Sequence, residues 1–210
     1  MIDKYFDMLE DWKLLPAYKL EPRIDSLVGY ALQTASADLL DVQCKILIPE
    51  LPIRLGTVHP QHVETHLENR SYKVDFYIRG QKGENVFIEF KTDSESIRDE
   101  QIGYLAEAEE VRMKAIVEGI LKLHKATQHK QKYEHLLNKL SMGGLIDSKN
   151  QAQIADEEIR IVFVQPRIVD GGKQEDVFDF KELSKSIRQS FPEERLMMRL
   201  ANSLELWAAD

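Results

Sequence analysis

The chain has 210 residues, a formal net charge of −8 and a single cysteine. This length suits one domain with a full hydrophobic core, so we predict a single domain over residues 1–210. The lone cysteine excludes an internal disulfide and a zinc site built from cysteines. No stretch has the length and apolar character of a membrane span or a signal peptide, so we expect no membrane partner and a cytoplasmic location.

Two helices are predicted before the first strand. Apolar residues recur at helical spacing in residues 1–15 and again in a helix that starts near Pro22. In the second helix Glu21 falls near the centre of the apolar stripe and Asp25 falls toward its edge. A carboxylate on a buried helix face needs a partner, which a bound cation would supply. The alternative is an acid favoured at a helix start by the macrodipole, and Asp25 is the second choice for the buried acid.

Residues 42–54 alternate apolar and polar side chains and predict a strand that ends at Pro49 or Pro52. Glu50 continues the inward-facing positions of this strand and is a lesser candidate for a site acid. A carboxylate bracketed by prolines is more typical of a solvated strand end. The histidines of residues 55–70 lack the HExxH arrangement of a zinc site, and a loop is the better interpretation.

Residues 71–93 are the most informative stretch, because they predict two short strands joined by a tight turn. Alternation places Asp75 on one face of the first strand, and Glu89 and Lys91 on one face of the second. If residues 81–83 form a three-residue loop, with glycine in the left-handed third position, Asp75 lies opposite Glu89. Facing carboxylates repel each other unless a cation lies between them. A divalent metal between the two carboxylates would remove this repulsion, and Lys91 faces the same space.

Residues 91–123 turn into a long helix, capped by the hydroxyl of Thr92, Ser94 or Ser96. Gln101 lies on the buried stripe of this helix, at the end nearest the hairpin. A buried amide at this position must be hydrogen-bonded.

Residues 124–142 predict a further helix that is closed by the glycines that follow it. Lys122, Lys125 and Lys130 belong to a basic strip in an otherwise acidic chain, and this strip could bind a phosphate backbone. A solvated helix face is the alternative.

The remaining sequence predicts one strongly apolar strand that ends before Pro166, a turn at the next glycines, and two helices from Phe178 that are broken at Phe191 and Pro192. We find no residues with evident chemistry in this C-terminal part.

The hairpin is similar to the metal-binding core of the PD-(D/E)xK nuclease superfamily, which includes many restriction endonucleases. The matching residues are Asp75 and the triplet Glu89, Phe90 and Lys91. Val74 stands where the pattern has proline. The resemblance implies an α/β fold with a restriction-endonuclease-like core over about residues 17–166. That core consists of a helix, three strands, a helix and a strand, in a mixed sheet flanked by helices. The helices over about residues 178–210 would be an extension.

The resemblance also implies a ligand set. Asp75, Glu89, the Phe90 carbonyl and Glu21 would hold Mg²⁺, for which Mn²⁺ can substitute. Lys91 would position the attacking water or balance charge. The expected activity is hydrolysis of phosphodiester bonds in nucleic acid, with DNA favoured.

Some relatives also carry a Gln-x-x-x-Tyr pair in the helix after the hairpin. Gln101 would orient the strand-end groups, and Tyr104 would contact substrate, although their spacing is one residue shorter here. A two-strand cutter of this size would need a homodimer. Two alternatives stay open. One is a nuclease-like fold that serves as a nucleic-acid or protein-binding module, and the other is a structural ion cluster in an unrelated domain.

Overall fold

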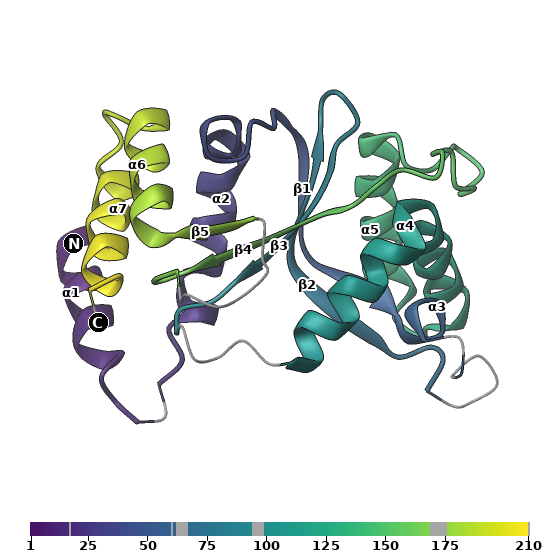
Figure 1. Cartoon of the computed structure of the whole chain (residues 1–210), viewed down its shortest axis with the longest axis horizontal. Coiled ribbons are helices and arrows are strands. Elements are labelled where there is room, and N and C mark those ends of the chain that lie inside the picture. Colours follow the sequence, from purple (N-terminus) through teal and green to yellow (C-terminus); the bar gives the residue numbers. More distant parts are fainter. Residues whose placement is uncertain (17, 60, 62–66, 94–98, 169–175, 210) are drawn as a thin grey trace. The chain divides into compact units, whose positions relative to one another are not determined.

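The computed structural model describes residues 1–16, 18–59, 61, 67–93, 99–168 and 176–209, without the side chains of residues 99–101. In chain order, the elements are α1 (Ile2–Trp12), α2 (Glu21–Leu39), β1 (Cys44–Arg54), α3 (Leu55–Val58), β2 (Ser71–Gly80), β3 (Asn85–Phe90), α4 (Asp99–Ala126), α5 (Lys130–Gly143), β4 (Arg160–Gln165), β5 (Val177–Asp179), α6 (Phe180–Ser190) and α7 (Arg195–Trp207). The five strands form one sheet in the order β1-β2-β3-β4-β5. Strands β2 and β3 are antiparallel, whereas β4 and β5 are parallel. The fold is therefore α/β, with a mixed sheet flanked by helices, as predicted (Figure 1).

The hairpin between β2 and β3 forms in the predicted register. Phe76 pairs with Ile88, and the pairing continues toward the turn. The amide of Gly80 donates to the carbonyl of Glu84 at 2.9 Å, and Gly83 has a φ of +97°. A left-handed third residue is what a three-residue hairpin loop requires, and glycine adopts it without a steric penalty.

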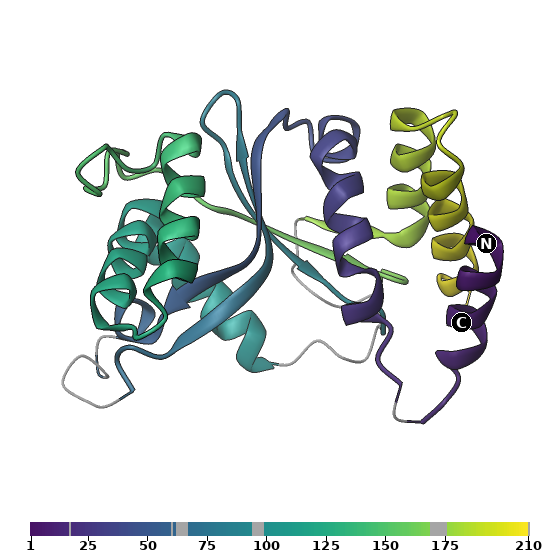
Figure 2. The ribbon, with the colours of Figure 1, turned by 180° about the vertical axis from the view of Figure 1, so that it is seen from behind.

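The chain divides into two compact units. Unit 1 contains residues 1–44, 89–97 and 162–210. In it, α7 packs against α1 and α6, and α6 packs against α2 (Figures 1 and 2). Phe90 at the end of β3 stacks on Phe180 of α6, with ring centroids 5.6 Å apart. Arg199 of α7 donates to Asp7 and Glu10 of α1, both at 2.8 Å. These contacts join the first and last helices of the chain.

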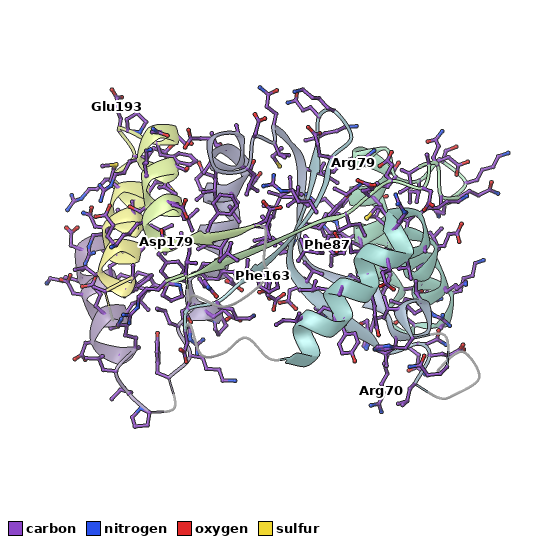
Figure 3. The ribbon with its side chains drawn as sticks, viewed as in Figure 1. Arg70, Arg79, Phe87, Phe163, Asp179 and Glu193 are labelled. Carbon is purple, nitrogen blue, oxygen red and sulfur yellow. The ribbon has the colours of Figure 1, made fainter. Side chains whose placement is uncertain are left out.

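Unit 2 contains residues 45–88 and 98–161. Here α4 packs against α3, and a Cβ atom added to Gly119 would lie 2.5 Å from the Thr57 hydroxyl oxygen. This close approach explains the glycine on the apolar stripe of α4. At the turn end of the hairpin, the Arg79 guanidinium bonds the Glu157 carboxylate, and the Asn85 amide donates to the same carboxylate at 3.0 Å. Figure 3 labels Arg79 in this cluster.

Strand β1 does not end at Pro49 or Pro52, as its sequence predicted, but runs through both to Arg54. Two features permit this. The strand lies at the edge of the sheet, where a missing proline N–H removes no necessary ladder bond. Glu50 has a φ of +53°, which interrupts the alternation of the strand and exposes its side chain.

Helix α4 was predicted as one continuous helix, but it is broken at Arg112, where φ is +64° and ψ is 168°. The amide of Met113 donates to the Glu157 carbonyl at 3.0 Å instead of to its own helix. Of the proposed caps, Ser94 and Ser96 lie outside the described residues.

The C-terminal helices α6 and α7 agree with the prediction, and the three-residue strand β5 before them was missed. Among the described residues, no helix is long and apolar enough to cross a membrane.

Candidate functional site

Glu89 and Lys91 form a buried ion pair at the end of β3. Glu89 is 1% exposed and Lys91 is 5% exposed. The Lys91 ammonium donates to Glu89 Oε1 at 2.6 Å and to the Phe90 carbonyl at 3.3 Å. The two-residue spacing puts both side chains on one face of the strand. Charges this deeply buried persist only when they are paired.

Glu21 reaches the same ammonium from helix α2. The distance from Lys91 Nζ to Glu21 Oε2 is 3.9 Å. Helix α2 begins at Glu21 itself, and Pro22 occupies the first turn, where its missing N–H costs no hydrogen bond. The structure thus brings the predicted helix acid to the Glu-x-Lys segment within unit 1. Asp25, the second choice, is exposed.

Asp75 lies on β2, one residue before Phe76, and is half-buried. The observed register, with Phe76 opposite Ile88, is the one that predicted Asp75 opposite Glu89. Asp75 and Glu89 belong to different units, and their pairing stays a prediction.

Tyr104 and Gln101, the two site residues predicted in this region, both lie in α4. Tyr104 is buried, and its hydroxyl donates to the Lys73 carbonyl at 3.1 Å. Its ring stacks on Tyr72, with centroids 4.4 Å apart and planes 9° apart. These contacts fasten α4 to β2, and the contact of Tyr104 with substrate stays a prediction. Gln101 lies in α4, but its side chain is outside the described part of the chain.

The three lysines of the predicted basic strip are all exposed but differ in their contacts. Lys122 and Lys125 are exposed on α4, as a phosphate-binding role requires. The ammonium of Lys130 donates to the carbonyls of His124 and Lys125, the latter at 2.9 Å. It therefore caps the C-terminal end of α4, where cations are favoured by the macrodipole.

Glu50 is a surface residue. Its carboxylate accepts from the Lys73 ammonium at 2.7 Å, and the two side chains are 57% and 62% exposed. The left-handed backbone at Glu50 explains why the inward parity that was predicted for it does not hold.

Gln165 at the end of β4 was not predicted as a site residue. It is 4% exposed, and its Oε1 atom accepts no hydrogen bond from any described residue. The available sequence signal was an amide placed at the end of an apolar strand, directly before Pro166. That signal alone does not distinguish a buried glutamine from a solvated strand end.

The residues near Lys91 fit a hard divalent cation in their chemistry. The described residues contain no cluster of three or more His, Cys, Asp or Glu side chains that could hold a metal. Mg²⁺, however, commonly uses only one or two carboxylates and keeps several waters. Glu21, Glu89 and the Phe90 carbonyl offer such oxygen donors around one position, where the Lys91 ammonium now supplies the positive charge.

Comparisons with known protein families, curated proteins and solved structures gave no match to this chain.

Proposed function

We propose that this chain is a metal-dependent nuclease of the PD-(D/E)xK type, with a restriction-endonuclease-like core, that hydrolyses phosphodiester bonds in nucleic acid, with DNA as the favoured substrate. One observation carries the proposal. The Lys91 ammonium lies 2.6 Å from the buried Glu89 carboxylate and 3.9 Å from an acid on the preceding helix. A strand-end Glu-x-Lys joined by a helix glutamate is the arrangement that the resemblance implies.

In this proposal each residue has a stated role. Glu89, Glu21 and the Phe90 carbonyl would hold Mg²⁺, together with Asp75 as the hairpin register predicts. When bound, the metal would lower the pKa of a water molecule and neutralise charge on the phosphate. The Lys91 ammonium would donate to a phosphate oxygen as negative charge develops there.

The test is a cleavage assay on supercoiled plasmid, single-stranded DNA and RNA, with Mg²⁺, with Mn²⁺ and with EDTA. Glu89→Gln, Asp75→Asn and Lys91→Met should each lower the rate by about 10²-fold or more. Glu158→Gln is the matched control, because this acid is exposed and contacts Arg112 on the surface of unit 2.

Two results would contradict the proposal. One is metal-independent cleavage, and the other is full activity in both the Glu89 and Lys91 variants. A chain that binds nucleic acid, but neither cleaves it nor binds Mn²⁺, would favour the alternative of a binding module.

A further inference from the structure

Gln165, whose side chain is buried, is a lateral neighbour of Lys91 in the sheet. The Lys91 amide donates to the Val164 carbonyl at 2.8 Å, which joins the ends of β3 and β4 within unit 1. Figures 1 and 2 show the arrowheads of these two strands pointing toward the same end. In a parallel pair of strands, the backbone amide of one residue donates to a carbonyl on the other strand. That carbonyl belongs to the residue directly before the lateral neighbour of the donor. Lys91 is therefore the neighbour of Gln165 and shares its face of the sheet.

The parallel pair of β4 and β5 follows the same rule. There the Phe163 amide donates to the Asp176 carbonyl, and the paired residue is the next one, Val177. Figure 3 labels Phe163, which lies two residues before Gln165 and therefore on the same strand face. On β5, the residue paired with Gln165 is Asp179.

Of these two lateral neighbours, only Lys91 carries a hydrogen-bond donor in its side chain. Asp179 caps helix α6, and its carboxylate accepts from the amides of Lys181 and Glu182, both at 2.9 Å. The Gln165 Oε1 atom is inaccessible to solvent, so an ion or water entering from solvent would not reach it directly. Lysine has three N–H donors on a flexible stem, and it can reorient toward a neighbouring acceptor.

A buried carbonyl oxygen without a donor costs free energy, so its presence calls for an explanation. The ammonium of Lys91 now donates to Glu89, the residue that would bind a metal under the proposed function. A divalent cation on Glu89 would compete with the ammonium for the same carboxylate oxygens and would repel it. Lys91 then needs a neutral acceptor close by, which Gln165 can provide.

We propose that Gln165 is a positioning residue. When a divalent cation occupies the Glu89 carboxylate, the Lys91 ammonium turns to Gln165 Oε1 and is held there, beside the cation, for contact with the substrate phosphate. This inference rests on the proposed function, because it requires a cation at Glu89. It assigns a role to a residue outside the Asp, Glu and Lys positions of the nuclease pattern.

The first experiment measures Mn²⁺ affinity by calorimetry on the metal-free whole chain. Gln165→Leu should raise the dissociation constant for Mn²⁺ about tenfold or more, as loss of an outer-shell partner does. Its thermal midpoint without metal should equal or exceed that of the wild type, because the substitution removes an unbonded buried carbonyl. A lower midpoint in Gln165→Leu would show an ordinary structural amide and would overturn the inference.

A double-mutant cycle then identifies the partner. In a Lys91→Met background, Gln165→Leu should change the Mn²⁺ dissociation constant by no more than about twofold. A tenfold change in that background would show that Gln165 acts on another group, and would overturn the inference. If Lys91→Met does not fold, the ¹⁵Nζ resonance of Lys91 replaces the cycle. The chemical shift of this resonance should be the same in wild type and Gln165→Leu without Mg²⁺, and should differ between them with Mg²⁺. Identical shifts in the presence of Mg²⁺ would overturn the inference.

The outcomes separate the two proposals. Wild-type protein that binds no Mn²⁺ overturns the proposed function and this inference together. Wild-type protein that binds Mn²⁺ and cleaves DNA, with the same affinity in Gln165→Leu, overturns only the role of Gln165.

Discussion

Two ion pairs of nearly equal length allow the energetic effect of burial to be measured. Lys91 and Glu89 lie 2.6 Å apart, with side chains 6% and 1% exposed. Lys73 and Glu50 lie 2.7 Å apart, with side chains 62% and 57% exposed. Replacing each lysine by methionine removes the ammonium and keeps most of the stem. The comparison therefore isolates the cost of leaving a carboxylate without its cation in the two environments.

The expected losses in the free energy of unfolding differ several-fold between the Lys91 and Lys73 variants. Lys91→Met leaves the Glu89 carboxylate buried beside an apolar side chain, and such a change typically costs about 3–5 kcal/mol. Lys73→Met leaves Glu50 in water, and exposed pairs contribute about 0–1 kcal/mol. If the free energy of unfolding falls by roughly 2 kcal/mol per molar urea, the urea concentration at the unfolding midpoint should be about 2 M lower in the Lys91 variant. The Lys73 variant should lose about 0.5 M or less.

The assay is urea unfolding followed by far-ultraviolet circular dichroism and by fluorescence of the buried Trp207, whose transitions should coincide if unfolding is cooperative. Adding Glu89→Gln to Lys91→Met should recover much of the loss, because the uncompensated charge is then removed. Equal small losses in the two lysine variants, or a double variant no more stable than Lys91→Met, would refute the reasoning.

Three further predictions concern other parts of the chain. Asp179→Ala should lower the free energy of unfolding by about 1 kcal/mol in the same urea assay, because it removes the N-cap of α6 and half of a capping box. The hydrogen bond from Arg79 holds the pKa of Glu157 below its ordinary value, so Glu157 stabilises the fold at neutral pH and loses this contribution as the pH falls through that lowered pKa. The free energy of unfolding, measured from about pH 6 to about pH 3, should fall more steeply in the wild type than in Glu157→Gln. Identical slopes in the two proteins would contradict this assignment. Burial raises the pKa of the Cys44 thiol to about 11, so iodoacetamide at neutral pH should alkylate it far more slowly than the same thiol in urea, as mass spectrometry can measure.

Local rules were sufficient for the hairpin and for the start of α2. The loop at residues 81–83 needed only a glycine at its third position, and the register of β2 and β3 followed from the loop length. The start of α2 followed from Pro22 and the apolar stripe, whereas the approach of Glu21 to Lys91 was implied by the resemblance and not by the projection. The hairpin loop and the helix start depend on residues close together in the sequence.

The features that were missed depend on contacts between distant residues. The edge position of β1, which permits its prolines, is a property of the whole sheet. The break in α4 at Arg112 contains neither glycine nor proline, and it is fixed by a bond from Met113 to Glu157. The capping role of Lys130 depends on how the chain turns between α4 and α5. Gln165 could be recognised only once its burial and its strand neighbours were known.

The composition of unit 1 has a consequence for synthesis on the ribosome. The segment with Glu89 and Lys91 belongs to the same unit as residues 1–44 and 162–210. Phe90 of this segment packs on Phe180, and α7 in turn holds α1 through Arg199. Phe90 therefore cannot gain its stacking partner, and α1 cannot gain its partner helix, until the last helices have emerged and folded. A nascent chain that stops before α6 would leave Phe90 exposed to water, on the opposite face of the segment that carries Glu89 and Lys91, so a truncated product is expected to form unit 1 incompletely.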